Sequence, residues 1–279
     1  MTEFARTTYN FNSRFILNDV TTDTTSYALL DIPTITDTLA LNTEDEKPEE
    51  AGIIDYGTKL GKGQWVVPVT LYASTLAKMA GLIQDFKEAF NPDLLEADAT
   101  YGLTTSYLGY HPLDWTETVD ATSRNFRMYV KTQEIPQVPV DSMSALIRAS
   151  SIKFKVADPR KYLQATTSLS GAGTATNAGT YTTPVQITVT ASGATSTSLT
   201  LTNSTTGKSI YVTTALSNND SLVIDTGLHS VKLNGTEKRS MLGNSSMEWW
   251  FLNPGANTLA ISNGTNATVS FVWRSAWPI

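Results

Sequence analysis

The stretch Val185-Gln186-Ile187-Thr188-Val189 alternates apolar and polar residues, and this alternation recurs through the last third of the chain. Successive side chains of a strand point to opposite faces, so each such run presents one apolar face. The further runs have their apolar residues at alternate positions: Leu199 and Leu201, Ile210 and Val212, Leu222 and Ile224, and Val269, Phe271 and Trp273. The region therefore predicts about six to ten strands in a β-sandwich, whose two sheets cover each other's inner faces.

Turn sequences separate these runs. Thr206-Gly207, Asn234-Gly235 and Asn263-Gly264 stand between them. An Asn-Gly pair tolerates the positive φ angles of a type I′ turn, whose twist matches that of the strands it joins. The two Asn-Gly pairs therefore predict two hairpins.

The composition changes near residue 165. From Gln164 to Thr183 the chain is uncharged and rich in Ser, Thr, Gly and Ala, which indicates a linker or an irregular first strand. We therefore expect an N-terminal domain over residues 1–165 and a C-terminal domain over residues 166–279. The first contains 15 Lys and Arg against 22 Asp and Glu and the second 5 against 4, so their net charges are -7 and +1, which sum to the -6 of the whole chain.

Whole-chain properties exclude several classes of protein. With 279 residues, 41% of them hydrophobic, the chain is long and apolar enough for two cores. It has no cysteine, so we expect no disulfide and no thiolate metal site. The start shows no secretory signal and no run of 18 apolar residues occurs, so we expect a soluble protein without a membrane partner. A pI near 5.0 disfavours binding driven by nucleic-acid phosphates.

The N-terminal domain is expected to be α+β. Residues 64–72 alternate as a strand, and Ser74 or Thr75 is placed to cap a following helix that Asn91-Pro92 ends. Residues 126–130 and 152–156 alternate as two further strands. The apolar face of the helix, which we expect to pack on the sheet, is formed by Leu76, Met79, Ala80, Ile83, Phe86 and Phe90.

Several stretches of the chain point to one family when their order and spacing are taken together. In the first domain these are the strand and helix from Trp65 to Phe90 and the strand from Ile152 that ends in Asp158-Pro159 before Arg160-Lys161-Tyr162. In the second they are Asn177-Ala178-Gly179-Thr180, Thr206-Gly207, the run from Asp220 to Asp225, and Leu252-Asn253-Pro254-Gly255-Ala256-Asn257 before Trp273. No single stretch is specific, but over nearly the full chain they resemble the distal tail proteins (Dit) of long-tailed, non-contractile bacteriophages.

The resemblance implies a mainly β architecture and a structural role without catalysis or cofactors. The N-terminal α+β domain, a sheet or split barrel plus one helix, would form a homohexameric ring around a channel, and a galectin-like β-sandwich would project from it. The resemblance further implies a hub at the tail tip of the virion, made in the cytoplasm of the bacterial host. Its expected partners are the tail-tube protein, a tail-associated baseplate protein, receptor-binding proteins, and DNA passing through the channel.

Two sets of residues are candidate contact sites. Glu44, Asp45, Glu46, Glu49 and Glu50 surround Lys47-Pro48 in a segment, residues 43–52, that lacks apolar periodicity. We expect a solvated mobile loop there, and as an alternative a loop that becomes ordered against a basic patch of a neighbouring subunit or tail protein.

Trp249 and Trp250 are the second candidate contact site. Core packing or a subunit contact is the favoured interpretation. The alternative is a carbohydrate-binding module that contacts host cell-wall polysaccharide. Neighbouring residues of a strand face opposite sides, so only one of the two should be exposed. His229, Asn234 and Arg239 are spaced too widely for the sugar-binding cluster of true galectins.

Catalytic patterns are weak. His111, expected in a loop, and His229, expected in a strand, are the two histidines, and no nucleophile-elbow sequence accompanies them. Asp114 and Glu117 form the nearest grouping for a glycoside hydrolase, although polar surface residues are the simpler interpretation. A wall-degrading hydrolase is thus the third candidate, after a tail hub and a sugar-binding module.

Overall fold

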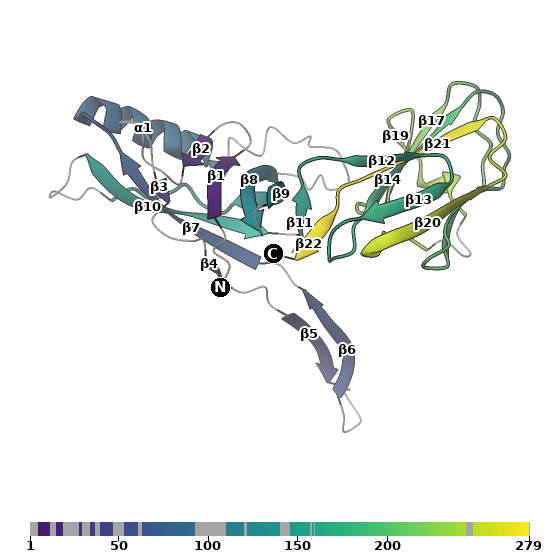
Figure 1. Ribbon diagram of the computed structural model, residues 1–279, viewed down its shortest axis with the longest axis horizontal. Helices are drawn as coiled ribbons and strands as arrows, with labels where there is room; N and C mark the ends of the chain where they lie inside the picture. The colour runs from purple at the N-terminus through teal and green to yellow at the C-terminus, as the bar shows by residue number, and fades with distance from the viewer. Residues whose placement is uncertain are drawn as a thin grey trace. The chain divides into compact units, whose positions relative to one another are not determined.

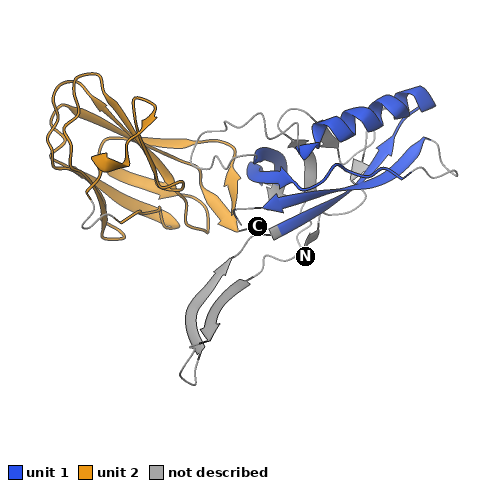
Figure 2. Cartoon of the chain, turned by 180° about the vertical axis from the view of Figure 1, so that it is seen from behind, with its two compact units in different colours: residues 1–100, 107–159 blue, residues 101–106, 160–279 orange. Residues whose placement is uncertain are grey.

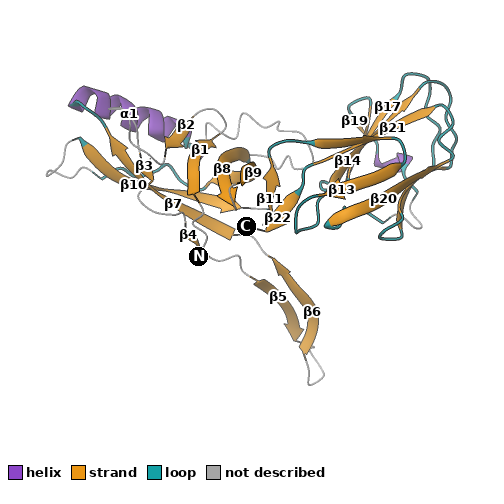
Figure 3. Cartoon of the chain, in the orientation of Figure 1, coloured by secondary structure: helices purple, strands orange, loops and turns teal. Residues whose placement is uncertain are grey.

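The computed structural model describes residues 5–11, 15–18, 28–29, 34–36, 40–46, 53–60, 63–92, 110–119, 122–139, 146–156, 158, 160–243 and 248–278. The chain forms two compact units, residues 1–100 with 107–159 (unit 1) and residues 101–106 with 160–279 (unit 2), shown in Figures 1 and 2. Strands predominate in both units, and a long helix lies in unit 1 (Figure 3). The expected mainly β class is therefore confirmed.

Unit 1 is built on a mainly antiparallel sheet with the strand order β10-β7-β3-β2-β1-β8-β9, and β4 (Thr34–Thr36) also pairs with β7. The bounds are β1 (Ala5–Phe11), β2 (Phe15–Asn18), β3 (Ala28–Leu29), β7 (Gly63–Tyr72), β8 (His111–Val119), β9 (Thr122–Thr132) and β10 (Ile147–Val156).

The two ends of this strand order meet. β10 pairs with β7 along its whole length, and its residues 154–156 also pair with residues 130–132 of β9. The sheet therefore closes on itself through a short pairing, as in the expected split barrel.

Alternate residues of these strands fill the interior of unit 1. Residues 65, 67, 69 and 71 of β7 are at most 1% exposed, as are residues 152 and 154 of β10, and the predicted inward residues of β9 are buried too. Trp65 meets Trp115 edge to face, with ring centroids 5.9 Å apart. The period-2 prediction for all three strands is confirmed.

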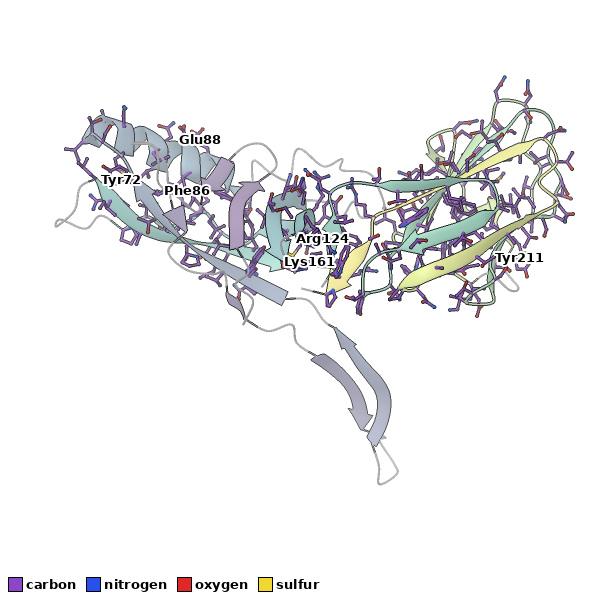
Figure 4. The ribbon with its side chains drawn as sticks, in the orientation of Figure 1. Tyr72, Phe86, Glu88, Arg124, Lys161 and Tyr211 are labelled. Carbon is purple, nitrogen blue, oxygen red and sulfur yellow. The ribbon has the colours of Figure 1, made fainter. Side chains whose placement is uncertain are left out.

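Helix α1 (Leu76–Ala89) begins where the capping residue predicts. The Thr75 hydroxyl accepts a hydrogen bond from the Lys78 backbone N–H at 3.2 Å, and the helix ends before Phe90 and Asn91-Pro92. Figure 4 shows Phe86 on the side of the helix nearer the strands and Glu88 on the other side. The Phe90 ring contacts those of Phe86 and Phe154, at centroid distances of 5.2 and 6.0 Å.

The buried stripe of α1 is rotated from the predicted one. Met79, Phe86 and Phe90 are buried as expected, whereas Leu76 is 63% exposed and Ala80 is exposed too. At 100° per residue, the stripe centred near Phe86 includes Ala89, leaves Leu76 at its margin and leaves Ala80 outside it. The prediction that these two residues face the sheet is therefore wrong.

The acidic segment is in part a strand. β5 (Ala40–Glu46) pairs with β6 (Ile53–Leu60) in a separate two-stranded sheet, with Glu44 opposite Asp55 and Glu46 opposite Ile53. The expected loop is therefore wrong for residues 43–46, because backbone pairing needs no apolar alternation. Glu49 and Glu50 lie outside the described residues.

Unit 2 contains two packed sheets. Their strand orders are β12-β21-β14-β17-β18-β19 and β13-β20-β15-β16, so the sandwich has ten strands, within the predicted range. The bounds are β12 (Thr167–Ser170), β13 (Gly173–Asn177), β14 (Val185–Ala191), β15 (Leu199–Asn203), β16 (Lys208–Val212), β17 (Ser221–Asp225), β18 (Ser230–Leu233), β19 (Thr236–Glu237), β20 (Gly255–Ser262) and β21 (Ala267–Trp273).

The sandwich core is the predicted set of alternating residues. Val185, Ile187 and Val189 of β14 are fully buried between the sheets, and Trp273 of β21 is 2% exposed. The alternate apolar residues of β15, β16 and β17 join the same cluster. Their burial supplies the hydrophobic free energy that holds the two sheets together.

One of the two Asn-Gly turns forms a hairpin. Asn234 (φ 49°) and Gly235 (φ 83°) join β18 to β19 in a two-residue turn, as predicted. The Asn234 amide donates to Asp220 Oδ1 at 2.8 Å, and this bond and one from the Ser217 N–H lower the pKa of Asp220. The hairpin expected at Asn263-Gly264 is wrong, because β20 and β21, which these residues help to connect, belong to different sheets.

The uncharged stretch from Gln164 to Thr183 is neither a linker nor a single strand. It contains β12 and β13, which pair with β21 and β20 respectively in opposite sheets. Ser and Thr side chains on the outer faces hid this alternation in the sequence.

The chain enters unit 2 beside its last described strand. β11 (Arg160–Leu163) pairs with β22 (Ala276–Pro278), with Tyr162 opposite Ala276. This pairing places residues 160–163 in unit 2, and the compact units divide between residues 159 and 160. The domain boundary at residue 165 stays a prediction.

The Phe86 side chain should account for most of the stability that α1 contributes. We expect Phe86→Ala to lower the free energy of unfolding by about 3–5 kcal/mol, because it removes a fully buried ring from the helix–sheet contact. Leu76→Ala, in the same helix but exposed, should change it by less than about 0.5 kcal/mol. Denaturant unfolding of both variants measures the difference, and similar losses would contradict the rotated stripe.

Gly179 is expected to accept no side chain. A Cβ there would lie 1.8 Å from the Ala276 carbonyl oxygen, so Gly179→Ala must displace β22. We expect the midpoint of urea unfolding of unit 2 to fall, by the equivalent of about 3 kcal/mol. Gly193→Ala is the control, because the added Cβ would meet only the Asn266 side chain, at 3.2 Å, and a side chain can move aside. Equal losses in both variants would show that the approach of residue 179 to β22 is not what matters.

Candidate functional site

The two carboxylates considered for hydrolysis do not face one another. Asp114 and Glu117 are three residues apart in β8, so they point to opposite faces of the strand. Glu117 is 2% exposed on the inner face with Leu113 and Trp115, whereas Asp114 is partly exposed on the outer face. Two carboxylates of a glycosidase must flank one bond, so this pair cannot form such a site.

Each of these carboxylates has a structural partner. Asp114 accepts two hydrogen bonds from Arg127 of the neighbouring strand β9, from Nε at 2.7 Å and from a terminal nitrogen at 2.8 Å. These bonds to Asp114 raise the pKa of Arg127, with burial of the guanidinium acting in the opposite direction. Glu117 accepts a bond from the Trp115 indole N–H at 3.3 Å. The geometry is that of a bidentate cross-strand ion pair and a satisfied buried acid.

The two histidines lie in settings opposite to those expected. His111, expected in a loop, is fully buried at the start of β8. His229, expected in a strand, lies in the turn before β18 with φ of 54°, a conformation that histidine adopts more readily than most residues. Both expected settings are therefore wrong, and the two residues belong to different units.

Trp249 and Trp250 have different roles. Trp250 is 1% exposed in the sandwich core, 6.3 Å from the Phe271 ring, so it cannot contact a sugar or a partner. Trp249 is half-buried against the same core. Residues 248–250 are not part of a strand, so the strand expected there is wrong, although one tryptophan is buried and the other partly exposed as expected.

An aromatic stack forms where the sequence suggested none. The His229 imidazole lies on the Trp249 indole, with centroids 4.8 Å apart and planes 14° apart, and the Arg239 guanidinium lies 5.8 Å from the indole centroid. His229 and Arg239 thus approach the same ring, while Asn234 is held by Asp220. The imidazole covers one face of Trp249, which removes that face as a platform for a sugar ring.

Two kinds of feature, metal-binding groups and membrane-spanning helices, can be assessed over the described part of the chain. No group of three or more His, Asp or Glu side chains among them could hold a metal ion. In the same part of the chain, no helix is long and apolar enough to span a membrane.

A cationic surface on unit 1 was missed in the sequence. Lys131 of β9 lies directly opposite Lys155 of β10, and Lys153 comes two residues before Lys155 on the same face. Their strand neighbours Val130, Thr132, Phe154 and Val156 are buried, so the three lysines lie on the outer face. We call them the lysine strip. They come from two separate stretches of a domain of net negative charge, and only the strand register brings them together.

The stretches that resemble the distal tail family build one end of the sandwich. Asn177 Oδ1 accepts hydrogen bonds from the N–H groups of Gly179 and Ala276, at 3.0 and 3.3 Å, and its Nδ2 donates to the carbonyls of Tyr181 and Leu252. In Leu252–Asn257, the Asn257 side chain bonds the Asn253 N–H and carbonyl, at 2.9 and 2.8 Å. The side chains of Asn177 and Asn257 thus organise backbone, which is a structural role without a chemical signature in the sequence.

Comparison with known protein families gives a match that includes these residues of unit 2. Residues 178–277 match the family described as siphovirus-type tail component, C-terminal domain. No curated protein sequence matches the chain.

Solved structures extend the comparison to unit 1. The crystal structure of the SPP1 Dit protein, described as a paradigm of the hub adsorption apparatus in phages that infect Gram-positive bacteria, has a TM-score of 0.60 at 14% identity, covering 98% of this chain and 99% of that one. A chain of the phage P2 baseplate in its activated conformation with Ca has a TM-score of 0.46 at 7% identity, covering 96% and 98%. The family match over residues 178–277 and the fold shared with SPP1 Dit confirm the resemblance to the distal tail proteins.

Proposed function

We propose that this chain is the structural hub at the distal end of a phage tail, where six copies form a closed ring. The family match over residues 178–277 carries the proposal, because it makes most of unit 2 similar to a siphovirus-type tail component. The fold shared with SPP1 Dit over 98% of the chain supports the same role for unit 1.

The architecture of unit 1 is suited to ring formation. A ring requires a heterologous contact, in which one surface of each copy meets a different surface of the next. The barrel sheet closes only through residues 154–156 of β10 among the described pairings, and β5–β6 forms a separate ribbon. Strand edges and ribbons of this kind offer backbone groups that a neighbouring copy can pair.

The proposed ring would join the tail tube to the tip of the tail. One face would bind the tail-tube protein and the other a tail-associated baseplate protein, with receptor-binding proteins at the periphery and DNA passing through the channel. The protein would be made in the host cytoplasm and would act in the virion without catalysis. The opposed faces of Asp114 and Glu117 and the satisfied bonds of both side chains support a structural role.

A sugar-binding function is less well supported. Trp250 is in the core, and one face of Trp249 is covered by His229. The alternative carbohydrate-binding module would therefore have to use the other face of Trp249 or a surface that the sequence did not suggest.

Native mass is the direct test of the hub. One copy is 30.3 kDa, so a closed ring of six should appear at about 182 kDa in light scattering across a concentration series. We expect this species alone or on addition of the tail-tube and baseplate proteins from the same phage. A monomer that persists with both partners, at concentrations well above those that assemble tails, would overturn the proposal.

Polysaccharide binding separates the hub from the sugar-binding alternative. We expect less than about a twofold difference between Trp249→Ala and the unmodified protein in pull-down on host cell-wall polysaccharide, since a covered ring contributes little to sugar stacking. Strong pull-down that Trp249→Ala abolishes would instead support the carbohydrate-binding module.

A further inference from the structure

The Arg239 side chain is held by an aromatic ring and not by an acid. Its guanidinium carbon lies 5.8 Å from the centre of the Trp249 indole, which is a cation–π contact. By contrast, the guanidinium groups of Arg127, Arg160 and Arg274 each donate a hydrogen bond to an oxygen of the chain. No acceptor among the described residues receives a hydrogen bond from the exposed Arg239 guanidinium. Its five N–H groups are therefore available to an anion.

The His229 imidazole lies on the same indole and is exposed too. Its ring is stacked on Trp249, with centroids 4.8 Å apart and planes 14° apart. In the part of the chain that the structure describes, the imidazole has no hydrogen bond and no ion pair. At least one nitrogen of an imidazole carries a hydrogen in either charge state. Trp249 thus anchors two side chains with N–H groups that an anion can bind.

The backbone that carries Arg239 is fixed to the sandwich. Arg239 is the first residue of the short 3-10 helix η1 (Arg239–Met241), and Met241 at its end is 6% exposed in the core. The Lys238 N–H, directly before the helix, donates to the Val231 carbonyl of β18 at 2.7 Å. The position of the guanidinium is therefore set by a buried residue on one side and a backbone bond on the other.

The turn that carries His229 is ordered by a buried acid. Asp225 Oδ1 accepts hydrogen bonds from the N–H groups of Gly227 and Leu228, at 2.9 and 3.0 Å. His229 follows directly, with φ of 54°. Side chains that are already in place lose little conformational entropy when a ligand binds, so this arrangement favours binding.

Positive charge in unit 2 is concentrated in the segment that carries both side chains. Residues 228–241 contain three basic residues against one acidic, whereas the other residues of 166–279 contain two against three. The basic residues of the segment are Lys232, Lys238 and Arg239. Its acid, Glu237, accepts a hydrogen bond from a backbone N–H of β18 at 3.1 Å. Glu248, which precedes the tryptophan, forms no ion pair with any described residue. The segment therefore attracts an anion.

We propose that Arg239 and His229, anchored on Trp249, form a binding site for a phosphate group. This site goes beyond the hub function, which requires no such ligand. A guanidinium binds two oxygens of an oxyanion with its paired N–H groups, and the imidazole N–H then requires a third acceptor. A phosphate group has three or more oxygens and a charge of about -1.5 to -2, whereas the arginine alone can occupy both oxygens of a carboxylate. The number of donors therefore favours phosphate.

The size of the site favours a single phosphate group over a nucleic acid. A protein that binds DNA through its backbone commonly neutralises about six to ten phosphates. Arg239, His229 and the neighbouring Lys238 offer fewer contacts than that. One face of Trp249 is covered by the imidazole, so successive bases could not stack on both faces. The ligand is therefore the free phosphate ion or a small phosphate ester.

Calorimetric titration of the full chain with inorganic phosphate tests the site. With the ionic strength held constant by sodium chloride, we expect saturable binding of one phosphate per chain. Arg239→Ala should weaken the affinity by about tenfold or more, because hydrogen bonds to charged groups are among the strongest. Lys78→Ala is the control: it removes one positive charge from an exposed position of α1 and should bind phosphate within about twofold of the unmodified protein. Absence of saturable binding, or equal affinities of the unmodified protein and Arg239→Ala, would refute the site.

Replacing the anchoring ring tests the arrangement of the site. Trp249→Leu leaves both donor side chains in the protein but removes the surface that orients them, so we expect the affinity for phosphate to fall by about tenfold. Thermal unfolding in chloride shows whether the variant is folded, and added phosphate should raise its Tm less than that of the unmodified protein. Phosphate binding that is unchanged in Trp249→Leu would overturn the assignment.

Competition between ligands identifies the source of the phosphate group. Glycerol 3-phosphate that binds at least about tenfold more tightly than inorganic phosphate would assign the site to a small phosphate ester. Equal or weaker binding of the ester would assign it to the free ion. Acetate is the test of the anion itself, since it offers a carboxylate in place of a phosphate. Acetate that binds as tightly as inorganic phosphate at the same ionic strength would refute a phosphate site.

Discussion

The sandwich unit depends on the hydrogen bonds of one buried side chain. Asn177 bonds Gly179, Tyr181, Leu252 and Ala276, which come from three separate parts of the sequence. Each of these backbone groups is close to the end of a strand, and one left buried without a partner would cost about 1–3 kcal/mol. The amide has a donor group and an acceptor atom, so it can satisfy N–H and C=O groups together. The positions of β13, β22 and the segment before β20 follow from this geometry.

Unit 1 is held together by a different constraint. Its core is a row of large side chains from β7, β8, β9 and β10, covered by the second half of α1. The same alternation that buries residues 130, 132, 154 and 156 places Lys131 and Lys155 opposite each other outside. The register is fixed by burial on the inner face, and the repulsion on the outer face is a consequence of that register.

Much of this could be predicted from the sequence, because burial imposes a period. The alternation in β7, β9, β10, β14, β15, β16, β17 and β21 identified strands and their inward residues, and Thr75 identified the start of α1. The Asn234-Gly235 turn followed from backbone conformation alone. Residues 164–183 were harder, since β12 and β13 are short and rich in Ser and Thr, and the inner face of β13 holds Gly, Ala and Asn in place of large apolar residues. Asn263-Gly264 failed as a hairpin because turn chemistry is local, whereas the sheet that receives the next strand is decided by the whole core.

The candidate sites were less predictable, because the fold and not the local sequence decides which residues meet. The lysine strip and the stack of His229 on Trp249 arise from residues that are distant in sequence, so no spacing pattern could reveal them. The sequence could have excluded Asp114 and Glu117 as the carboxylate pair of a glycoside hydrolase, since a separation of three residues in a strand puts side chains on opposite faces. It required knowing that residues 111–119 form one strand.

The pairing of β11 with β22 has a consequence for how such proteins diversify. The chain enters the sandwich and reaches its last described strand at neighbouring positions, with Tyr162 opposite Ala276. The segment between these two strands therefore begins and ends at the same place in the fold. An insertion into the chain between these two strands would leave its entry and its exit at neighbouring positions, because the pairing of β11 with β22 fixes both. Unit 2 can therefore vary in length and in loops while the chain still enters and leaves it at the same place.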